Sequence, residues 1–208
     1  MRGVGIVVAL RVEARCITPL RLSFNQRTKL GNGTSVWLCG VGAEAAGEAA
    51  TGLRNAGATA LMSFGFAGAL RSGLNPGSLV LPESIHAGGR PLPVDLDWRA
   101  RLRQCLPDNL NVVGGVLAVS SEVLTSASAK RELADATGAS AVDMESGAVA
   151  EVAAIARLPF MAVRAVSDPL EFSPPAVLLD AVRPDGSPHL VRLLGLLLRR
   201  SLTLGTLL

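Results

Sequence analysis

Two carboxylate residues late in the chain each follow an apolar segment, a placement that suits chemistry on a hydroxylated substrate. Asp168 follows the segment 160–166, and Glu145 ends the run Val142-Asp-Met-Glu. In a parallel sheet flanked by helices, ligands bind just beyond the carboxyl ends of the strands. Two acids at that edge can have different roles: one can bind sugar hydroxyls while the other transfers a proton.

Asp168 has both a structural and a functional interpretation. Pro169 follows it, removes the next backbone donor and pushes Asp168 towards an extended conformation. An aspartate in a turn or a helix cap would explain this pattern. An acid held beside a leaving group would explain it equally well, since burial and hydrogen bonding can keep a proton on a carboxyl group.

Glu145 also has two interpretations. It stands at the first turn of an expected helix, where the helix dipole favours negative charge. The functional alternative is a glutamate at a strand end that accepts two hydrogen bonds from a vicinal diol. Asp143 and Glu145 are two residues apart in an otherwise apolar segment, which predicts that their side chains point the same way. Met144 between them suits contact with a sugar or base edge, or simple core packing.

Glycines follow two of the expected strands. Gly40-Val-Gly42 and Gly65-Phe-Ala-Gly68 are interpreted as loops whose backbone amides can approach an anion or a sugar closely. As phosphate signatures they are weak, because the chain has neither the GxxxxGK[ST] nor the GxGxxG pattern.

Length and composition favour one folded domain over 1–208. The chain has 208 residues, of which 49% are hydrophobic and 18% charged, which argues against a disordered protein. Aromatic residues make up 3% and Tyr is absent, which argues against a surface that stacks on nucleic acid bases. Three scattered cysteines and two distant histidines predict reduced thiols in the cytoplasm and no metal site.

Apolar runs alternate with helical patterns along the chain. This alternation predicts a three-layer α/β/α sandwich around a mixed, largely parallel sheet, with Glu13 in a polar turn and 65–69 as a loop. The expected strands are 4–10, 35–39, 60–64, 78–82, 112–119, 141–144 and 160–166, and the expected helices are 44–55, 97–104, 127–137, 146–157 and 190–200.

The motifs V-D-M-E-S at 142–146 and V-R-A-V-S-D at 163–168, in this order, resemble those of the nucleoside phosphorylase family. That family includes purine and uridine phosphorylases and the methylthioadenosine/adenosylhomocysteine nucleosidases, and the resemblance spans residues 5 to about 170. It implies cleavage of the bond between ribose and base through an oxocarbenium-like transition state. It also implies no cofactor, with phosphate as a co-substrate in the phosphorylases, and a homo-oligomer.

The resemblance assigns roles to individual residues. Asp168, with Ser167 beside it, would protonate the departing purine, and Glu145 would hold the ribose hydroxyls against Met144. Glu13 matches the acid that orients the attacking water in the nucleosidases. The other residues expected at the substrate are Phe66, Ala67, Gly68, Leu124, Thr125 and Asp143, with Gly42 and Arg164 at the phosphate or water site.

A narrower resemblance is to the hopanoid-associated phosphorylases of bacteria, which are taken to remove adenine from adenosylhopane. It rests on the segments 63–68, 89–95, 141–146 and 182–188. Phe66 stands where the family usually has a small polar residue, and Leu124 where it often has an aromatic one. These departures predict a more apolar pocket, which would fit a lipid-linked adenine nucleoside and would equally fit a loss of activity.

Several alternatives stay open at this stage. Glu13 favours water over phosphate because two anions repel, but Arg15, Arg71 or Arg164 could supply the opposite charge. A methylthioadenosine-type nucleosidase and a catalytically silent binding protein are the other candidates; the presence of both Glu145 and Asp168 favours an enzyme. The Leu-rich segment 190–208 is expected to be a helix packed on the sheet, with peripheral membrane contact through its arginines as the alternative.

Overall fold

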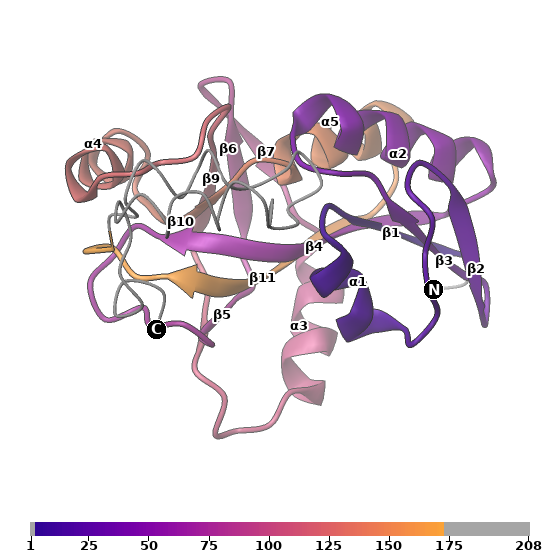
Figure 1. The fold of residues 1–208 in the computed structure, drawn as a ribbon, viewed down its shortest axis with the longest axis horizontal. Coiled ribbons are helices and arrows are strands. Elements are labelled where there is room, and N and C mark those ends of the chain that lie inside the picture. Colours follow the sequence, from indigo (N-terminus) through magenta and orange to yellow (C-terminus); the bar gives the residue numbers. More distant parts are fainter. Residues whose placement is uncertain (1–2, 173–208) are drawn as a thin grey trace, which may run out of the picture.

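The computed structural model describes residues 3–172, in which eleven strands form one mixed sheet with helices on both faces (Figure 1). The strands are β1 (Val4–Val8), β2 (Arg27–Gly31), β3 (Thr34–Leu38), β4 (Ala60–Ala69), β5 (Leu79–Val80), β6 (Ser84–Ala87), β7 (Arg90–Pro93), β8 (Val112–Val113), β9 (Val116–Val119), β10 (Ala139–Asp143) and β11 (Phe160–Asp168). The helices are α1 (Arg11–Ile17), α2 (Ala43–Asn55), α3 (Leu96–Cys105), α4 (Ala127–Thr137) and α5 (Ser146–Ala156).

The helices cover the sheet in the way the sequence predicts. Figure 1 shows α2 and α5 above the central strands and α1 and α3 below them, with α4 near β9 and β10. Alanines on α2 and α5, such as Ala46 and Ala150, are almost fully buried, which lets the two helices pack closely against the sheet. The predicted three-layer α/β/α sandwich is confirmed.

Strand β4 is the centre of the sheet, and its two edges are used differently. β11 runs parallel to it along one edge, from Leu61 to Gly68. On the other edge β1 pairs parallel as far as Ser63, and β10 pairs antiparallel at Gly68 and Ala69. Because β1 and β10 approach from opposite directions, their carboxyl ends meet over residues 64–67 of β4.

The predicted loop over residues 65–69 is wrong, because β4 continues as a strand to Ala69. The glycines there leave room for side chains. A Cβ atom on Gly65 would collide with the carboxylate of Glu13 and would lie 2.6 Å from Nη1 of Arg164. A Cβ atom on Gly68 would lie 3.1 Å from Oδ2 of Asp168. The glycine pattern therefore reflects space for carboxylates at the sheet surface.

Other segments also differ from expectation. Glu13 lies in the short helix α1 and not in a turn. The expected strand 112–119 is broken at Gly115, whose φ of +87° favours glycine, and its halves pair in different parts of the sheet. The short strands β2, β6 and β7 were not predicted. The expected helix 190–200, its alternative membrane contact and the segment 182–188 lie outside the described residues.

The packing at Gly65 predicts that Gly65→Ala destabilises the protein. A methyl group in this tight space should cost about 1–3 kcal/mol of unfolding free energy, as overpacking usually does. The matched control is Gly47→Ala in α2, where a Cβ atom would make only an ordinary contact of 3.7 Å with Ala148. That control should gain about 0.5–1 kcal/mol. Chemical unfolding of both variants provides the measurement, and equal stability would contradict the role assigned to Gly65.

Candidate active site

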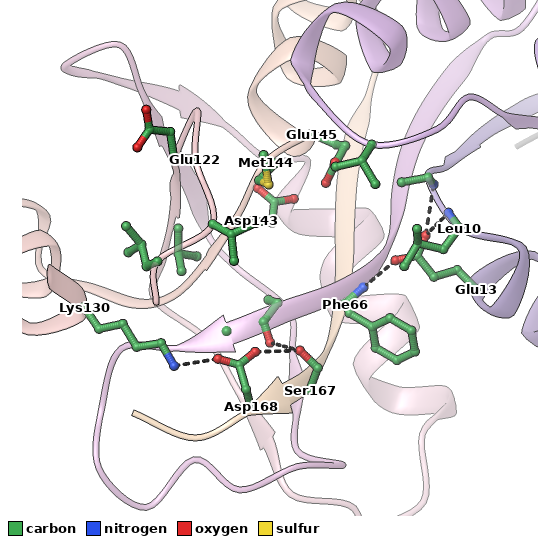
Figure 2. Close-up of a pocket in the computed structure, with 17 residues that line it drawn as sticks. Leu10, Glu13, Phe66, Glu122, Lys130, Asp143, Met144, Glu145, Ser167 and Asp168 are labelled. Atoms are coloured by element: carbon green, nitrogen blue, oxygen red, sulfur yellow. Dashed lines mark hydrogen bonds and ion pairs between the residues drawn. The ribbon is translucent and has the colours of Figure 1, made fainter. Parts of the chain in front are cut away.

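A pocket opens where the carboxyl ends of β1, β10 and β11 meet above β4, and Figure 2 shows it in close-up. It encloses about 670 Å³, part of which is open to solvent. Its lining residues are Ala9, Leu10, Glu13, Val41, Phe66, Ala67, Gly68, Glu122, Val123, Leu124, Lys130, Val142, Asp143, Met144, Glu145, Ser167 and Asp168.

Glu13 is the third residue of α1, and its carboxylate is held by backbone donors. Oε2 accepts the N–H groups of Ala9 at 2.9 Å and Leu10 at 2.8 Å, while Oε1 accepts that of Phe66 at 2.9 Å. The residue is only 4% exposed. An ionised carboxylate can accept about four hydrogen bonds. Glu13 therefore keeps a fixed orientation and one acceptor position for a further donor, such as a water molecule.

Asp168 ends β11, and both of its oxygens accept hydrogen bonds. The hydroxyl group of Ser167 donates to Oδ1 at 2.8 Å. The ammonium group of Lys130, which reaches over from α4, donates to Oδ2 at 2.5 Å. The Asp168 side chain is 28% exposed and the Lys130 side chain 1%. This geometry is that of a carboxylate with a buried counter-charge, facing the pocket (Figure 2).

Asp143 and Glu145 do not share partners, although both line the pocket. Asp143 Oδ2 accepts from Arg164 Nε at 2.7 Å and from the backbone N–H of Ser146 at 3.0 Å, so it anchors the start of α5. Its Oδ1 is buried and has no hydrogen-bond partner among the described residues. Leaving such an atom unpaired costs about 1–3 kcal/mol. A water molecule or a ligand hydroxyl could satisfy it.

Glu145 accepts one hydrogen bond, from the backbone N–H of Gly42 at 2.8 Å. Burial raises the pKa of Glu145 above its ordinary value, and the neighbouring carboxylates of Asp143 and Glu13 raise it further. The positive charge of Arg164 and the Gly42 hydrogen bond oppose this shift. Oε2 of Glu145 has no hydrogen bond within residues 3–172, so it is available to ligand hydroxyls.

Arg164 is buried and has no contact with the pocket itself. Besides Asp143, its Nη2 donates to the hydroxyl oxygens of Ser63 at 2.5 Å and Ser146 at 3.0 Å. Burial alone would lower the pKa of Arg164, but the carboxylates of Asp143, Glu145 and Glu13 raise it above the ordinary value. The guanidinium group therefore stays charged and is committed to holding the strands together.

The structure brings ten of the predicted site residues to this pocket: Glu13, Phe66, Ala67, Gly68, Leu124, Asp143, Met144, Glu145, Ser167 and Asp168. Thr125, Gly42 and Arg164 do not line it, nor do Arg15 and Arg71. Gly42 acts on the site indirectly, through its bond to Glu145. The expected role of Arg164 at a phosphate position is therefore not supported by its placement.

Sequence reasoning missed Lys130 and the apolar wall formed by Leu10, Val41 and Val123. A signal for Lys130 existed. Lys130, Leu133 and Ala134 have the helical spacing that puts residues on one face, and the latter two pack against a core cluster. A lysine on an inward helical face is unusual, because lysine is almost never fully buried unless it is paired.

Within residues 3–172, no group of three or more His, Cys, Asp or Glu residues is arranged to hold a metal ion. None of the helices in the described part of the chain is long and apolar enough to cross a membrane.

The raised pKa of Glu145 predicts that Glu145→Gln is at least as stable as the natural protein at pH 7. Because the folded pKa lies above the unfolded one, the ionised side chain opposes folding. This effect is fully present above the folded pKa and disappears as the pH falls to the ordinary value of 4.5. Thermal unfolding at pH 5 and pH 7 should show a larger gain for the variant at pH 7. The exposed Glu48→Gln serves as the control, and a variant less stable at pH 7 would contradict the assignment.

Solved structures of several nucleosidases share this fold. A Helicobacter pylori 5′-methylthioadenosine nucleosidase variant with 5′-methylthioadenosine in the active site has a TM-score of 0.71 and 20% identity, over 82% of this chain and 87% of that chain. The Neisseria meningitidis 5′-methylthioadenosine/S-adenosylhomocysteine nucleosidase has a TM-score of 0.72 and 22% identity, over 82% and 87%. The Helicobacter pylori futalosine hydrolase has a TM-score of 0.70 and 21% identity, over 82% and 86%.

Similarity at this level of identity establishes the fold only. Among curated protein sequences, none is significantly similar to this chain. The family assignment rests on the family model described as the phosphorylase superfamily, which matches residues 6–183 and so covers most of the chain. It confirms the nucleoside phosphorylase family, and an enzyme of the phosphorylase or nucleosidase type, predicted from the V-D-M-E-S and V-R-A-V-S-D motifs. The chain belongs to the phosphorylase superfamily.

Proposed function

We propose that this protein hydrolyses the N-ribosyl bond of an adenine nucleoside. The observation that carries the proposal is the placement of three carboxylates around one pocket. In Figure 2, Asp168 and Glu13 lie on opposite sides of the pocket, and Glu145 lies between them on a third side. This arrangement allows an acid to face the leaving group and a base to face the attacking water.

Each carboxylate then has one task in the reaction. Asp168 delivers a proton to a ring nitrogen of the purine, so that the base leaves as a neutral molecule. Glu145 accepts hydrogen bonds from the ribose hydroxyls through its open Oε2 and stabilises the positive charge that develops on the sugar. Glu13 uses its remaining acceptor position to orient water towards the anomeric carbon and takes the spare proton.

The charges of the pocket favour water over phosphate. Five acidic residues line it: Glu13, Glu122, Asp143, Glu145 and Asp168. Lys130 is the only lysine or arginine among the lining residues that the structure describes, and it is already bound to Asp168. Phosphate would have to approach several carboxylates without a free counter-charge, and like charges at close range repel strongly in a partly buried site.

The apolar rim of the pocket favours a nucleoside with a large apolar substituent. Val41 and Val123 line the pocket while remaining 40% and 56% exposed, and Leu10, Phe66 and Leu124 add further apolar surface. Exposed apolar side chains at a pocket mouth are typical of a binding surface. Together with the resemblance to the hopanoid-associated phosphorylases, this supports an adenosyl lipid of the adenosylhopane type as the substrate.

A small thioether nucleoside is the alternative substrate. The Helicobacter pylori relative was solved with 5′-methylthioadenosine in its active site, and its fold matches this chain. The pocket, with a volume of about 670 Å³, would accommodate such a ligand. The two alternatives differ in their contacts with the exposed side chains of Val41 and Val123. A lipid substituent would cover these side chains, whereas a methylthio group would leave most of their surface exposed.

The reaction type predicts that adenine release does not depend on phosphate. Adenosine, 5′-methylthioadenosine and a 5′-alkylated adenosyl lipid analogue should be incubated with the protein, each with and without phosphate, and adenine quantified. We expect release without phosphate, fastest for the lipid analogue. Release that requires phosphate would contradict hydrolysis, and release from 5′-methylthioadenosine alone would contradict the lipid substrate.

The role of Asp168 predicts that Asp168→Asn loses turnover while keeping affinity. Loss of general acid catalysis typically costs 10²–10⁴-fold in rate. The affinity for a non-cleavable adenosine analogue, measured by calorimetry, should change far less. Asp135→Asn, at an exposed position of α4, is the control. A natural protein that binds the analogue but releases no adenine from any nucleoside would identify a silent binding protein instead.

A further inference from the structure

Lys130 is a buried charged residue to which the reaction outlined above assigns no role. It is the only residue of α4 that is buried, and its side chain is 1% exposed. Its ammonium group donates to Asp168 Oδ2 at 2.5 Å, to the carbonyl oxygen of Pro169 at 2.8 Å and to that of Phe172 at 3.3 Å. All three donors of the lysine are used.

The hydrogen bonds of Asp168 raise a question about the source of its proton. Lys130 donates to Oδ2, and Ser167 donates to Oδ1. If Asp168 accepts both of these bonds, as an ionised carboxylate does, it has no proton of its own to give. The proposed acid must therefore receive a proton before or during cleavage. Lys130 is the charged neighbour within hydrogen-bond distance that can supply one.

We propose that Lys130 and Asp168 form one acid unit, in which the buried ammonium group supplies the proton that Asp168 passes to the departing base. The inference rests on the proposed N-ribosyl cleavage and deepens it. As the bond between the anomeric carbon and the base nitrogen breaks, its electron pair stays on the base. One proton moves from Nζ to Oδ2 and on to a ring nitrogen, which leaves a neutral lysine, an ionised Asp168 and a neutral base.

The remaining atoms balance through the water molecule. Its oxygen bonds to the anomeric carbon, and its spare proton goes to Glu13. When the products leave, solvent exchange returns a proton to Lys130 and removes one from Glu13. Ser167 fits both states of Asp168, because its hydroxyl oxygen also lies 3.3 Å from the carbonyl oxygen of Ala67. The hydroxyl can turn to that carbonyl whenever Asp168 Oδ1 no longer needs a donor.

Stability alone does not account for a lysine at this position. A buried ammonium group loses its hydration, and such pairs often contribute no more to stability than apolar residues of similar size. Asp168 is 28% exposed and would remain partly hydrated without its partner. A purely structural role is nevertheless available, because Lys130 also ties down the carbonyl groups of Pro169 and Phe172. The test must separate these two roles.

The experiment compares two substrates that differ in their leaving groups. Adenosine, or whichever adenine nucleoside the natural protein cleaves best, needs a proton on its base. A p-nitrophenyl riboside does not, because nitrophenolate leaves as a stable anion. We expect Lys130→Met to lower kcat on the nucleoside by about 10²-fold or more, as loss of a general acid does, but kcat on the nitrophenyl riboside by less than tenfold.

Double-substitution kinetics add a readout that does not depend on the artificial substrate. If Lys130 acts through Asp168, Lys130→Met with Asp168→Asn should be no slower than Asp168→Asn alone. Lys130→Arg keeps the charge but should not recover the rate, because a guanidinium group does not give up its proton. Arg131→Met removes the same charge from an exposed neighbour on α4 and should leave kcat unchanged. Melting temperatures show whether each variant is folded, and Lys130→Gln replaces Lys130→Met if the latter unfolds.

Each outcome has a definite meaning. Equal losses of Lys130→Met on both substrates, or additive losses in the double variant, would identify a structural role and overturn the acid unit. A Lys130→Met variant as fast as the natural protein would overturn it as well. If the natural protein cleaves no nucleoside at all, the proposed N-ribosyl cleavage fails first, and that failure is visible before any variant is made.

Discussion

The ion pair between Arg164 and Asp143 is the interaction on which the geometry of the pocket depends. It joins β11 to β10, and the same guanidinium group donates to Ser63 on β4 and Ser146 at the start of α5. A buried charge without a partner is strongly destabilising, so this network fixes one arrangement of the strand ends. Its positive charge also lowers the pKa of Glu145, against the effect of burial. The arginine therefore supports an acidic pocket that it does not enter.

The sequence predicts those site residues whose signal is local. Asp168 and Glu145 stand at the ends of apolar runs, and the position of such a strand end follows from hydrophobic patterning alone. Glu13 has no such signal, because it sits in a short helix and becomes important only where β1 meets β10 on β4. Its assignment needed the family resemblance. The pairing of Lys130 with Asp168 escaped prediction because the two residues lie in different elements, far apart along the chain.

The glycines of β4 show why part of the fold could not be predicted. Gly65 and Gly68 suggest a loop, because glycine favours turns when only neighbours in sequence are considered. In the structure they lie in a central strand, and what they accommodate is the side chains of Glu13, Arg164 and Asp168. The need for that space arises from residues distant in sequence. A glycine-rich segment can therefore indicate either a turn or a strand packed against large side chains, and the local sequence does not distinguish the two.

Three carboxylates of the pocket, those of Glu13, Glu145 and Asp168, differ in what compensates their charge, and in the proposed reaction this difference divides the chemistry among them. Glu13 is held by neutral backbone N–H groups, which suits an oriented base. Glu145 has one backbone donor and a raised pKa, with an oxygen left open for hydroxyl groups. Asp168 faces a buried ammonium group. When neighbouring acids lie in different environments, their pKa values differ. One site can then supply both an acid and a base at neutral pH. A phosphate nucleophile would bring a fourth negative centre among these three without a partner, whereas water adds no charge.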